Sequence, residues 1–156
     1  MTRRMITKSE GIPYYRAAAD YWYEVVGLQH SRCLKQSATS VQARADLNFY
    51  VVAVQRLREV AYMARKRPGI EGAGQLLQEF DERWPRFREL GNDKEHVLSP
   101  SSGYPTGIWY FGDVEADLKS GAVDYIVSVR DMEPWVKKLY ESLCDLLNEE
   151  DAQQPN

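Results

Sequence analysis

This chain of 156 residues contains few of the residues that build metal centres and no segment suited to span a membrane. It has two histidines and two cysteines. His30 and Cys33 have a spacing that suits a metal ion, but two ligands do not make a site, so we expect no zinc centre and no cofactor. No apolar run approaches the roughly 18 residues that a bilayer-spanning helix requires, so we expect no membrane protein.

Several common catalytic and targeting signals are also missing. The sequence has no glycine loop that could cradle a phosphate, no paired-carboxylate motif and no nucleophile elbow. The basic residues 1–8 are not followed by an apolar stretch, so we expect no secretory signal and a cytoplasmic location. In that reducing compartment Cys33 and Cys144, each among apolar helical residues, are expected to be unpaired core side chains.

The charge distribution is uneven, although the net charge is only −3. Residues 149–151 make the C-terminal end acidic, whereas the middle of the chain is basic. A basic middle permits contact with nucleic acid but does not require it. The cations of this basic segment are Arg56, Arg58, Arg65, Lys66, Arg67, Arg83, Arg86 and Arg88.

Four segments show the helical period of apolar residues. The first begins near Pro13, a residue suited to the start of a helix. The second has the strongest pattern, begins near Thr39 or Ser40 as a cap, and ends at residues 65–69, where cations and Pro-Gly stop a helix. We expect this second helix to form the centre of the core. The apolar stripes are Tyr14, Ala17, Tyr21, Val25 and Leu28 in the first segment, and Leu47, Tyr50, Val51, Val54, Leu57, Ala61 and Ala64 in the second, widened by Phe49, Val52, Val60 and Met63.

The third and fourth segments complete the expected bundle. Pro85 interrupts the third, because proline breaks the hydrogen-bond ladder of a helix interior, so this helix kinks or restarts there. The fourth begins near Asp131 and runs to the acidic tail. Their stripes are Leu76, Leu77, Phe80, Trp84, Phe87 and Leu90 in the third, and Trp135, Val136, Leu139, Tyr140, Leu143, Leu146 and Leu147 in the fourth.

Between the third and fourth segments the pattern changes to that of short strands. Residues 108–111 and 123–127 are rich in aromatic and β-branched residues, and a hairpin that turns near residues 119–121 is expected. The sequence thus predicts a mainly α protein with a single domain over residues 1–156. The predicted architecture is a four- to five-helix up-and-down bundle with a small β-hairpin before the last helix. Residues 1–10 and 149–156 are expected to be disordered.

The segment after the third helix carries the most distinctive polar residues. Residues 90–96 place one of the two histidines, His96, at a polar junction beside three arginines. A histidine with a near-neutral pKa could take a proton from a ribose 2'-hydroxyl and return one to the leaving 5'-oxygen, while a cation holds the phosphate charge. The alternative is structural: Asn92 or Asp93 caps a new helical turn, and His96 faces solvent.

Residues 47–147 resemble the HEPN superfamily. Members have four or five helices, with a long apolar helix before a kinked one, followed by a motif of arginine, a polar residue and, four to six positions on, histidine. In its commoner form the order is Arg, Asn, two variable residues, Glu and His. Residues 91–96 match this order at Asn92, Glu95 and His96 and depart from it at Gly91, where the motif has arginine. Residues 48–65 are also similar to the preceding helix of bacterial members.

The resemblance implies two kinds of function. Catalytic members are metal-independent ribonucleases that act as dimers, with the arginine and histidine of both subunits in one cleft, whereas other members have lost the motif and serve as binding or antitoxin-like partners. Arg88 lies one helical turn before Gly91, about 4.5 Å along the axis, and could replace the missing arginine, with Arg86 or Lys94 as secondary phosphate contacts. The alternative is that Arg83, Arg86 and Arg88 form a solvated helix face.

Aromatic residues offer a second nucleic-acid feature. Tyr104 and Trp109 belong to an aromatic segment, residues 104–111, that could stack on unpaired bases, or could instead be half-buried against the bundle. The predicted RNA-binding residues are therefore Arg83, Arg86, Lys94, Tyr104 and Trp109, beside the predicted catalytic residues Arg88, Asn92, Glu95 and His96.

Three functional hypotheses follow. The preferred one is a degenerate HEPN-like domain, expected as a homodimer with its interface near His96, that binds RNA, a nucleotide or an antitoxin-type partner protein in bacterial defence or a toxin–antitoxin system. The second is an active metal-independent endoribonuclease that uses His96 with Arg88. The third is a structural or interaction protein with no nucleic-acid role, which is favoured if the arginines are dispersed over the surface.

Overall fold

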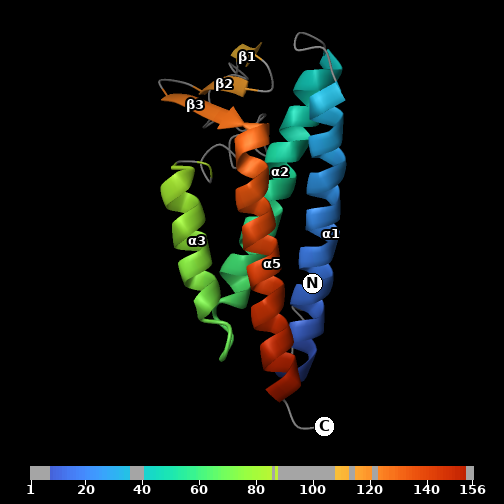
Figure 1. Cartoon of the computed structure of the whole chain (residues 1–156), viewed down its shortest axis with the longest axis vertical. Coiled ribbons are helices and arrows are strands. Elements are labelled where there is room, and N and C mark those ends of the chain that lie inside the picture. The colour runs from blue at the N-terminus through green and yellow to red at the C-terminus, as the bar shows by residue number, and fades with distance from the viewer. Residues whose placement is uncertain are drawn as a thin grey trace, which may run out of the picture.

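The computed structural model describes residues 8–35, 41–85, 87, 108–112, 115–120 and 123–153. Within these residues the chain forms four helices: α1 (Lys8–Lys35), α2 (Val41–Ala64), α3 (Gly72–Arg83) and α5 (Val129–Gln153). Successive helices in this series run in opposite directions along one bundle, and the prediction of a mainly helical protein is confirmed (Figure 1). No helix in the described ranges is both long and apolar enough to cross a bilayer.

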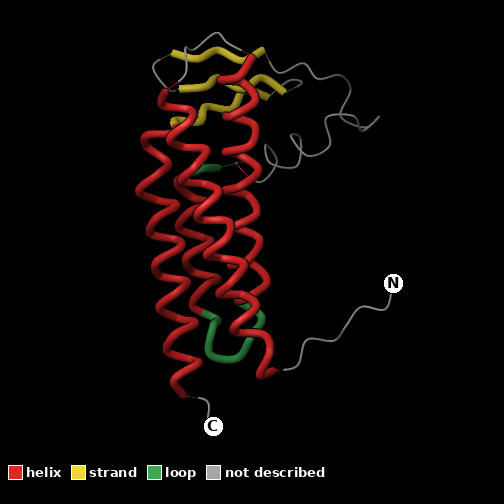
Figure 2. The backbone as a smooth tube through the Cα atoms, turned by 90° about the vertical axis from the view of Figure 1, so that its right-hand side faces the viewer, coloured by secondary structure: helices red, strands yellow, loops and turns green. Residues whose placement is uncertain are grey.

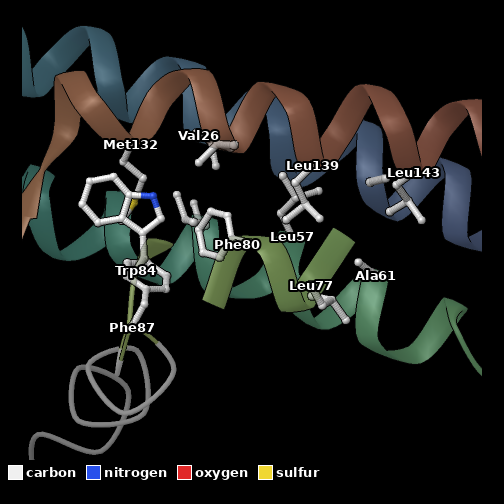
Figure 3. Close-up of a cluster of buried hydrophobic side chains, with 14 of the residues drawn as sticks. Val26, Leu57, Ala61, Leu77, Phe80, Trp84, Phe87, Met132, Leu139 and Leu143 are labelled. Carbon is white, nitrogen blue, oxygen red and sulfur yellow. The ribbon is translucent and has the colours of Figure 1, made fainter. Parts of the chain in front are cut away.

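Helix α2 forms the centre of the core, as its sequence predicts. All seven residues of its predicted stripe are at most 1% exposed. Figure 3 shows Leu57 and Ala61 of this helix gathered with Leu77 of α3 and with Leu139 and Leu143 of α5. Burying such side chains contributes about 1.5–3 kcal/mol each, so this one-sided stripe accounts for the position of the helix.

The predicted end of the second helix and the predicted interruption at Pro85 are also confirmed. Helix α2 ends at Ala64, and the turn that follows contains Gly69 with φ of 85°, a left-handed conformation that glycine adopts without strain. Helix α3 ends at Arg83, just before Pro85, and the Trp84 backbone N–H donates to the Phe80 carbonyl oxygen at 2.9 Å. The sequence thus predicts both interruptions of the helical structure correctly. Leu90, the last residue of the predicted third stripe, lies outside the described residues.

Helix α1 buries a different side from the one predicted. Its predicted stripe includes Tyr14, Tyr21 and Leu28, and all three are exposed. The buried apolar residues are Ile12, Ala19 and Val26, which recur at the same seven-residue step on another side of the helix. Both sides of α1 carry a repeating apolar pattern, so periodicity alone could not decide which side faces the core.

The outer helices extend beyond their predicted ends. Helix α1 begins at Lys8, so Pro13 lies inside the helix rather than at its start. Helix α5 begins at Val129 and continues to Gln153. Residues 8–10 and 149–153, which were expected to be disordered, are therefore helical, while residues 1–7 and 154–156 lie outside the described residues.

A three-stranded antiparallel sheet stands at one end of the bundle (Figures 1 and 2). Its strands are β1 (Ile108–Gly112), β2 (Glu115–Ser120) and β3 (Val123–Ser128), in the order β1-β2-β3. The two predicted strands correspond to β1 and β3, but they do not pair with each other, because β2 lies between them. The predicted small hairpin of two strands is therefore not seen. β3 leads directly into α5.

Candidate protein interface on helices α1 and α2

Most of the predicted nucleic-acid site falls outside the described residues. The predicted residues that are not described are Arg86, Arg88, Asn92, Lys94, Glu95, His96 and Tyr104. Of the other two, Trp109 lies in β1 and is described for its backbone alone, and Arg83 is the last residue of α3. The Arg83 guanidinium lies 4.4 Å from the centroid of the Trp84 ring. The motif at residues 91–96 therefore stays a prediction.

Four arginines of the basic segment are engaged at separate places on the bundle, although Arg65 is followed directly by Lys66 and Arg67, and Arg65 and Lys66 both lie over the ring of Tyr62. Arg58 is buried between α2 and α3, where its Nε donates to Asp81 Oδ1 at 2.7 Å. Arg56 is paired with a glutamate of its own helix. Arg65 and Arg83 each cover an aromatic ring, at 4.1 and 4.4 Å from the ring centroid. These four arginines do not form the continuous cationic groove that follows a phosphate backbone.

The described residues also offer little for metal or thiol chemistry. Within them, no group of three or more His, Cys, Asp or Glu side chains is placed to hold a metal ion. Cys33 and Cys144 are free thiols, in agreement with the sequence. Burial raises the pKa of Cys33 to about 12, with a further contribution from the negative charge of Asp46. Because only a thiolate is an effective nucleophile, Cys33 is a core side chain rather than a reactive one.

The large exposed hydrophobic side chains of the described residues all lie on α1 and α2. Tyr14 is 57%, Tyr21 59% and Leu28 51% exposed on α1, and Phe49 is 60% and Met63 47% exposed on α2. Isolated apolar side chains are common on protein surfaces, but a contiguous group of them indicates a site of interaction. We refer to the surface formed by these five residues as the α1–α2 face.

The five residues follow a common spacing along the two helices. Tyr14, Tyr21 and Leu28 are separated by steps of seven, and Phe49 and Met63 lie seven residues on either side of Arg56. Seven residues make almost two helical turns, so each set lies along one side of its helix. Helices α1 and α2 are antiparallel neighbours and pack more extensively on each other than on any other helix in the described part (Figures 1 and 2).

A hollow opens between α1 and α2 toward one end of this face. Its volume is about 510 Å³, which is in the range of sites that accept a side chain or a small ligand. The hollow includes Tyr14 and Met63 of the face, and its other walls are largely aromatic or aliphatic. It is lined by Tyr14, Tyr15, Ala18, Trp22, Arg56, Glu59, Val60 and Met63.

One ion pair lies in the wall of this hollow. Arg56 Nη1 donates to Glu59 Oε2 at 2.8 Å, and the two side chains are 41% and 40% exposed. The pair has no net charge, so the hollow has no strong preference for an anionic or a cationic ligand. An exposed pair of this kind contributes little to stability, about 0.3–0.5 kcal/mol within a helix.

On its side toward α5, α1 is held by polar contacts within the chain. The Tyr140 hydroxyl donates to Asp20 Oδ1 at 2.7 Å, and this hydrogen bond is the largest cause of a raised Tyr140 pKa. The ring of Tyr140 stacks on Tyr23 with the centroids 4.0 Å apart. Arg16 also donates to Asp20 and to Asn148 of α5. These contacts join α1 to α5 through residues other than the exposed tyrosines at positions 14 and 21.

Within the described part of the chain, buried polar atoms without a hydrogen-bond partner lie on α1, α2 and α5. The atoms Gln29 Oε1, His30 Nε2, Tyr50 Oη and Glu133 Oε2 are buried and have no hydrogen-bond partner among the described residues. The rings of His30 and Tyr50 have centroids 6.3 Å apart. Burial and the nearby Glu133 raise the pKa of Tyr50, so its hydroxyl keeps its proton. Unsatisfied buried atoms reduce stability, and we regard this group as a feature of the core.

Comparisons with models of protein families, with curated proteins and with solved structures find no match to this chain. The candidate site is therefore defined by the geometry of the α1–α2 face alone. Sequence reasoning misses this face because it assigns Tyr14, Tyr21 and Leu28 to the core. The signal that could have found it is the presence of two apolar stripes on α1, since a helix packed on one side of a bundle needs one.

Proposed function

We propose that this protein is a helical domain that associates with protein through the α1–α2 face. One observation carries the proposal: within the described residues, every large exposed hydrophobic side chain lies on this pair of helices. Tyr, Phe and Met are enriched in protein interfaces, and removing such side chains from water supplies much of the binding free energy. An aromatic hollow beside them would accept a protruding side chain of the bound protein.

Among the described residues, the distribution of charge favours a protein ligand over RNA. Binding to RNA needs cations that follow the phosphates, and the arginines at positions 56, 58, 65 and 83 are held by carboxylates or rings at separate places. The α1–α2 face contains aromatic side chains that could stack on bases, but its hollow has a neutral ion pair rather than excess positive charge. This combination is typical of a protein interface.

The proposal corresponds to the partner-binding form of the HEPN-like hypothesis and to the interaction-protein alternative. HEPN membership, binding of RNA or a nucleotide, a toxin–antitoxin role and ribonuclease activity stay predictions, because they depend on residues 86–107, of which only Phe87 is described. A homodimer and an antitoxin-type partner are both forms of the protein association proposed here.

The test is a comparison of affinity-tagged full-length chains isolated from cells that also produce an untagged copy. Tyr21→Glu places a charge at the centre of the face, at a position that is 59% exposed and therefore tolerant of it. Lys137→Gln on the exposed side of α5 changes the net charge by the same amount and serves as the matched control. Retained proteins are identified by mass spectrometry and recombined in purified form.

We expect wild type and Lys137→Gln to hold one protein in a fixed ratio, and Tyr21→Glu to lose it while keeping an unchanged melting temperature. The reconstituted complex must show the same dependence on Tyr21. Equal retention by Tyr21→Glu, or copurification of RNA with no protein, would contradict the proposal.

A further inference from the structure

The two ends of the α1–α2 face are complementary to each other. At one end the hollow is lined by Tyr14 and Met63, and at the other end Leu28 and Phe49 protrude. Phe49 is the most exposed of the five large hydrophobic residues at 60%. A surface that carries both a protruding group and a hollow for such a group can bind a second copy of itself.

The spacing of the residues determines how two copies would meet. The hollow spans Tyr14 to Trp22 on α1 and Arg56 to Met63 on α2, so low numbers on α1 lie level with high numbers on α2. Extending this antiparallel register along the two helices places Leu28 level with Phe49, and Tyr21 level with Arg56. Tyr21 and Arg56 therefore mark the midpoint of the α1–α2 face along the helix axes. Tyr14 and Met63 lie about 10 Å from this midpoint in one direction, and Leu28 and Phe49 lie about 10 Å from it in the other.

A twofold axis at this midpoint brings unlike ends together. If the axis lies in the plane of the interface and perpendicular to the helices, rotation places each α1 antiparallel to the α1 of the other copy. Leu28 and Phe49 of each copy then reach the hollow of the other, so that two identical contacts form at once. A C2 interface requires this self-complementarity, and C2 dimers are the commonest assemblies of soluble proteins.

We propose that the α1–α2 face binds a second copy of this chain about this twofold axis, with Phe49 of each copy entering the hollow of the other. This inference rests on the proposed function and names the bound protein. It differs from the sequence expectation of a dimer interface near His96, because the surface that carries it is formed by the first two helices.

The charges at the centre agree with this arrangement. Arg56 lies at the level of the axis, and Glu59 lies one turn away toward the hollow. The rotation places the Glu59 of the second copy one turn to the other side, so that each guanidinium has a carboxylate on both sides. The two ion pairs thus form one group of four charges with no net charge, in the order Glu, Arg, Arg, Glu along the helices, and no charge is buried without a partner.

The size of the face predicts a reversible dimer. From Tyr14 to Leu28 it extends about 20 Å, and two helices are together about 20 Å wide, which gives on the order of 400 Å² in projection on each copy. The accessible area of a rough surface exceeds its projection, but the interface remains near the lower end for specific complexes. We therefore expect dissociation in the micromolar range.

The test is sedimentation equilibrium of the full-length protein between about 1 and 100 μM, a range that brackets such an affinity. Phe49→Lys removes the protruding group, and Met63→Glu places a negative charge in the hollow. Each variant alone should raise the dissociation constant by about tenfold or more, as loss of a central aromatic contact does. Lys137→Gln should behave as wild type, and all variants should keep the wild-type circular dichroism spectrum.

An equimolar mixture of Phe49→Lys and Met63→Glu gives the decisive result. In the mixed dimer, Phe49 of the Met63→Glu chain meets an unaltered hollow. The lysine introduced at position 49 of the other chain faces the introduced glutamate at position 63, so dimerisation should be restored to near the wild-type level. If each variant weakens the dimer and mixing the two variants does not restore dimerisation, the proposed antiparallel arrangement of the two copies is overturned.

Two further outcomes separate the inference from the proposed function. A dimer that is unaffected by either variant would overturn both the inference and the proposed function. A chain that stays monomeric at every concentration overturns the inference alone, provided that a different protein is held in a Tyr21-dependent manner.

Discussion

Arg58 of α2 and Asp81 of α3 form a bidentate ion pair at the edge of the core. Arg58 Nε donates to Asp81 Oδ1 at 2.7 Å, and Arg58 Nη2 donates to Asp81 Oδ2. The arginine side chain is 8% exposed, whereas that of the aspartate is 41% exposed. A buried guanidinium stays charged and needs a partner, because leaving an ion unpaired away from water is costly. This pair therefore joins the two helices and withdraws one arginine of the basic segment from solvent.

We expect Asp81→Ala to destabilise the protein by about 1–3 kcal/mol, because it leaves Arg58 buried without its partner. Urea unfolding followed by circular dichroism measures the change. Asp145→Ala, at an exposed position on α5, is the matched control and should change stability by no more than about 0.5 kcal/mol. Equal losses from the two variants would show that the ion pair does not stabilise the contact between α2 and α3.

The central position of α2 makes a second stability prediction. Leu57→Ala should cost about 2–5 kcal/mol, since Leu57 is fully buried between helices and its truncation leaves a cavity. Met63→Ala removes a side chain of similar size from the same helix at a site that is 47% exposed, and should cost less than about 1 kcal/mol. Thermal melting of the two variants separates these values. A Leu57→Ala loss as small as that of Met63→Ala would contradict the core assignment.

The contrast between α2 and α1 shows what periodicity could predict. The buried residues of α2 form one broad stripe, because this helix lies between α1 and α3 and contacts both. Helix α1 carries Ile12, Ala19 and Val26 on its buried side and larger residues on its exposed side. Ranking the two stripes by size favours the exposed one, since burying a larger apolar residue is worth more. Only the positions of the neighbouring helices decide between the stripes.

Strand β2 shows a different limit of structure prediction from the sequence. Residues 115–120 have the sequence Glu-Ala-Asp-Leu-Lys-Ser, and Ala, Asp, Glu and Lys are depleted in strands. This segment is nevertheless the central strand, paired on both sides, for example at Asp117 with Tyr110 and with Ile126. Pairing with two strands of strong β propensity outweighs the local preference. His96 and its neighbours, which make up the predicted nucleic-acid site, lie outside the described residues.

Tyr50 provides a test of the buried polar atoms on α1, α2 and α5. Its hydroxyl is buried and has no hydrogen-bond partner among the described residues. Removing an unsatisfied polar group is neutral or favourable, so Tyr50→Phe should leave stability unchanged or raise it by up to about 1–2 kcal/mol. The control is Tyr140→Phe, which loses a hydrogen bond to Asp20 and should cost about 0.5–1.5 kcal/mol. Chemical denaturation that finds Tyr50→Phe the less stable of the two would show that its hydroxyl is satisfied in solution.

The burial of Cys33 predicts slow thiol chemistry. Its pKa of about 12 lies above the ordinary value for a thiol, so the reactive thiolate is scarce at neutral pH. We expect alkylation by iodoacetamide to be slow in the folded protein and to accelerate by about tenfold for each unit of pH between 7 and 9, because the thiolate fraction rises by that factor. Mass spectrometry of timed samples gives the rate at Cys33, and urea-unfolded protein is the reference. A rate that levels off below pH 9 would mean a lower pKa than burial implies.

The remaining question about catalysis is answered with RNA in excess EDTA. We expect no cleavage of structured or unstructured RNA by the wild-type protein, because Gly91 stands where the motif has arginine, and the loss of a preorganised charge donor costs about a hundred- to a thousandfold in rate. His96→Ala identifies contaminating nuclease, whose activity survives the substitution. Cleavage that is lost in both His96→Ala and Arg88→Ala would instead establish a metal-independent ribonuclease in which Arg88 replaces the missing arginine. In that case the α1–α2 face would retain a role as the surface that assembles the enzyme, and Phe49→Lys should then reduce cleavage in proportion to the loss of dimer.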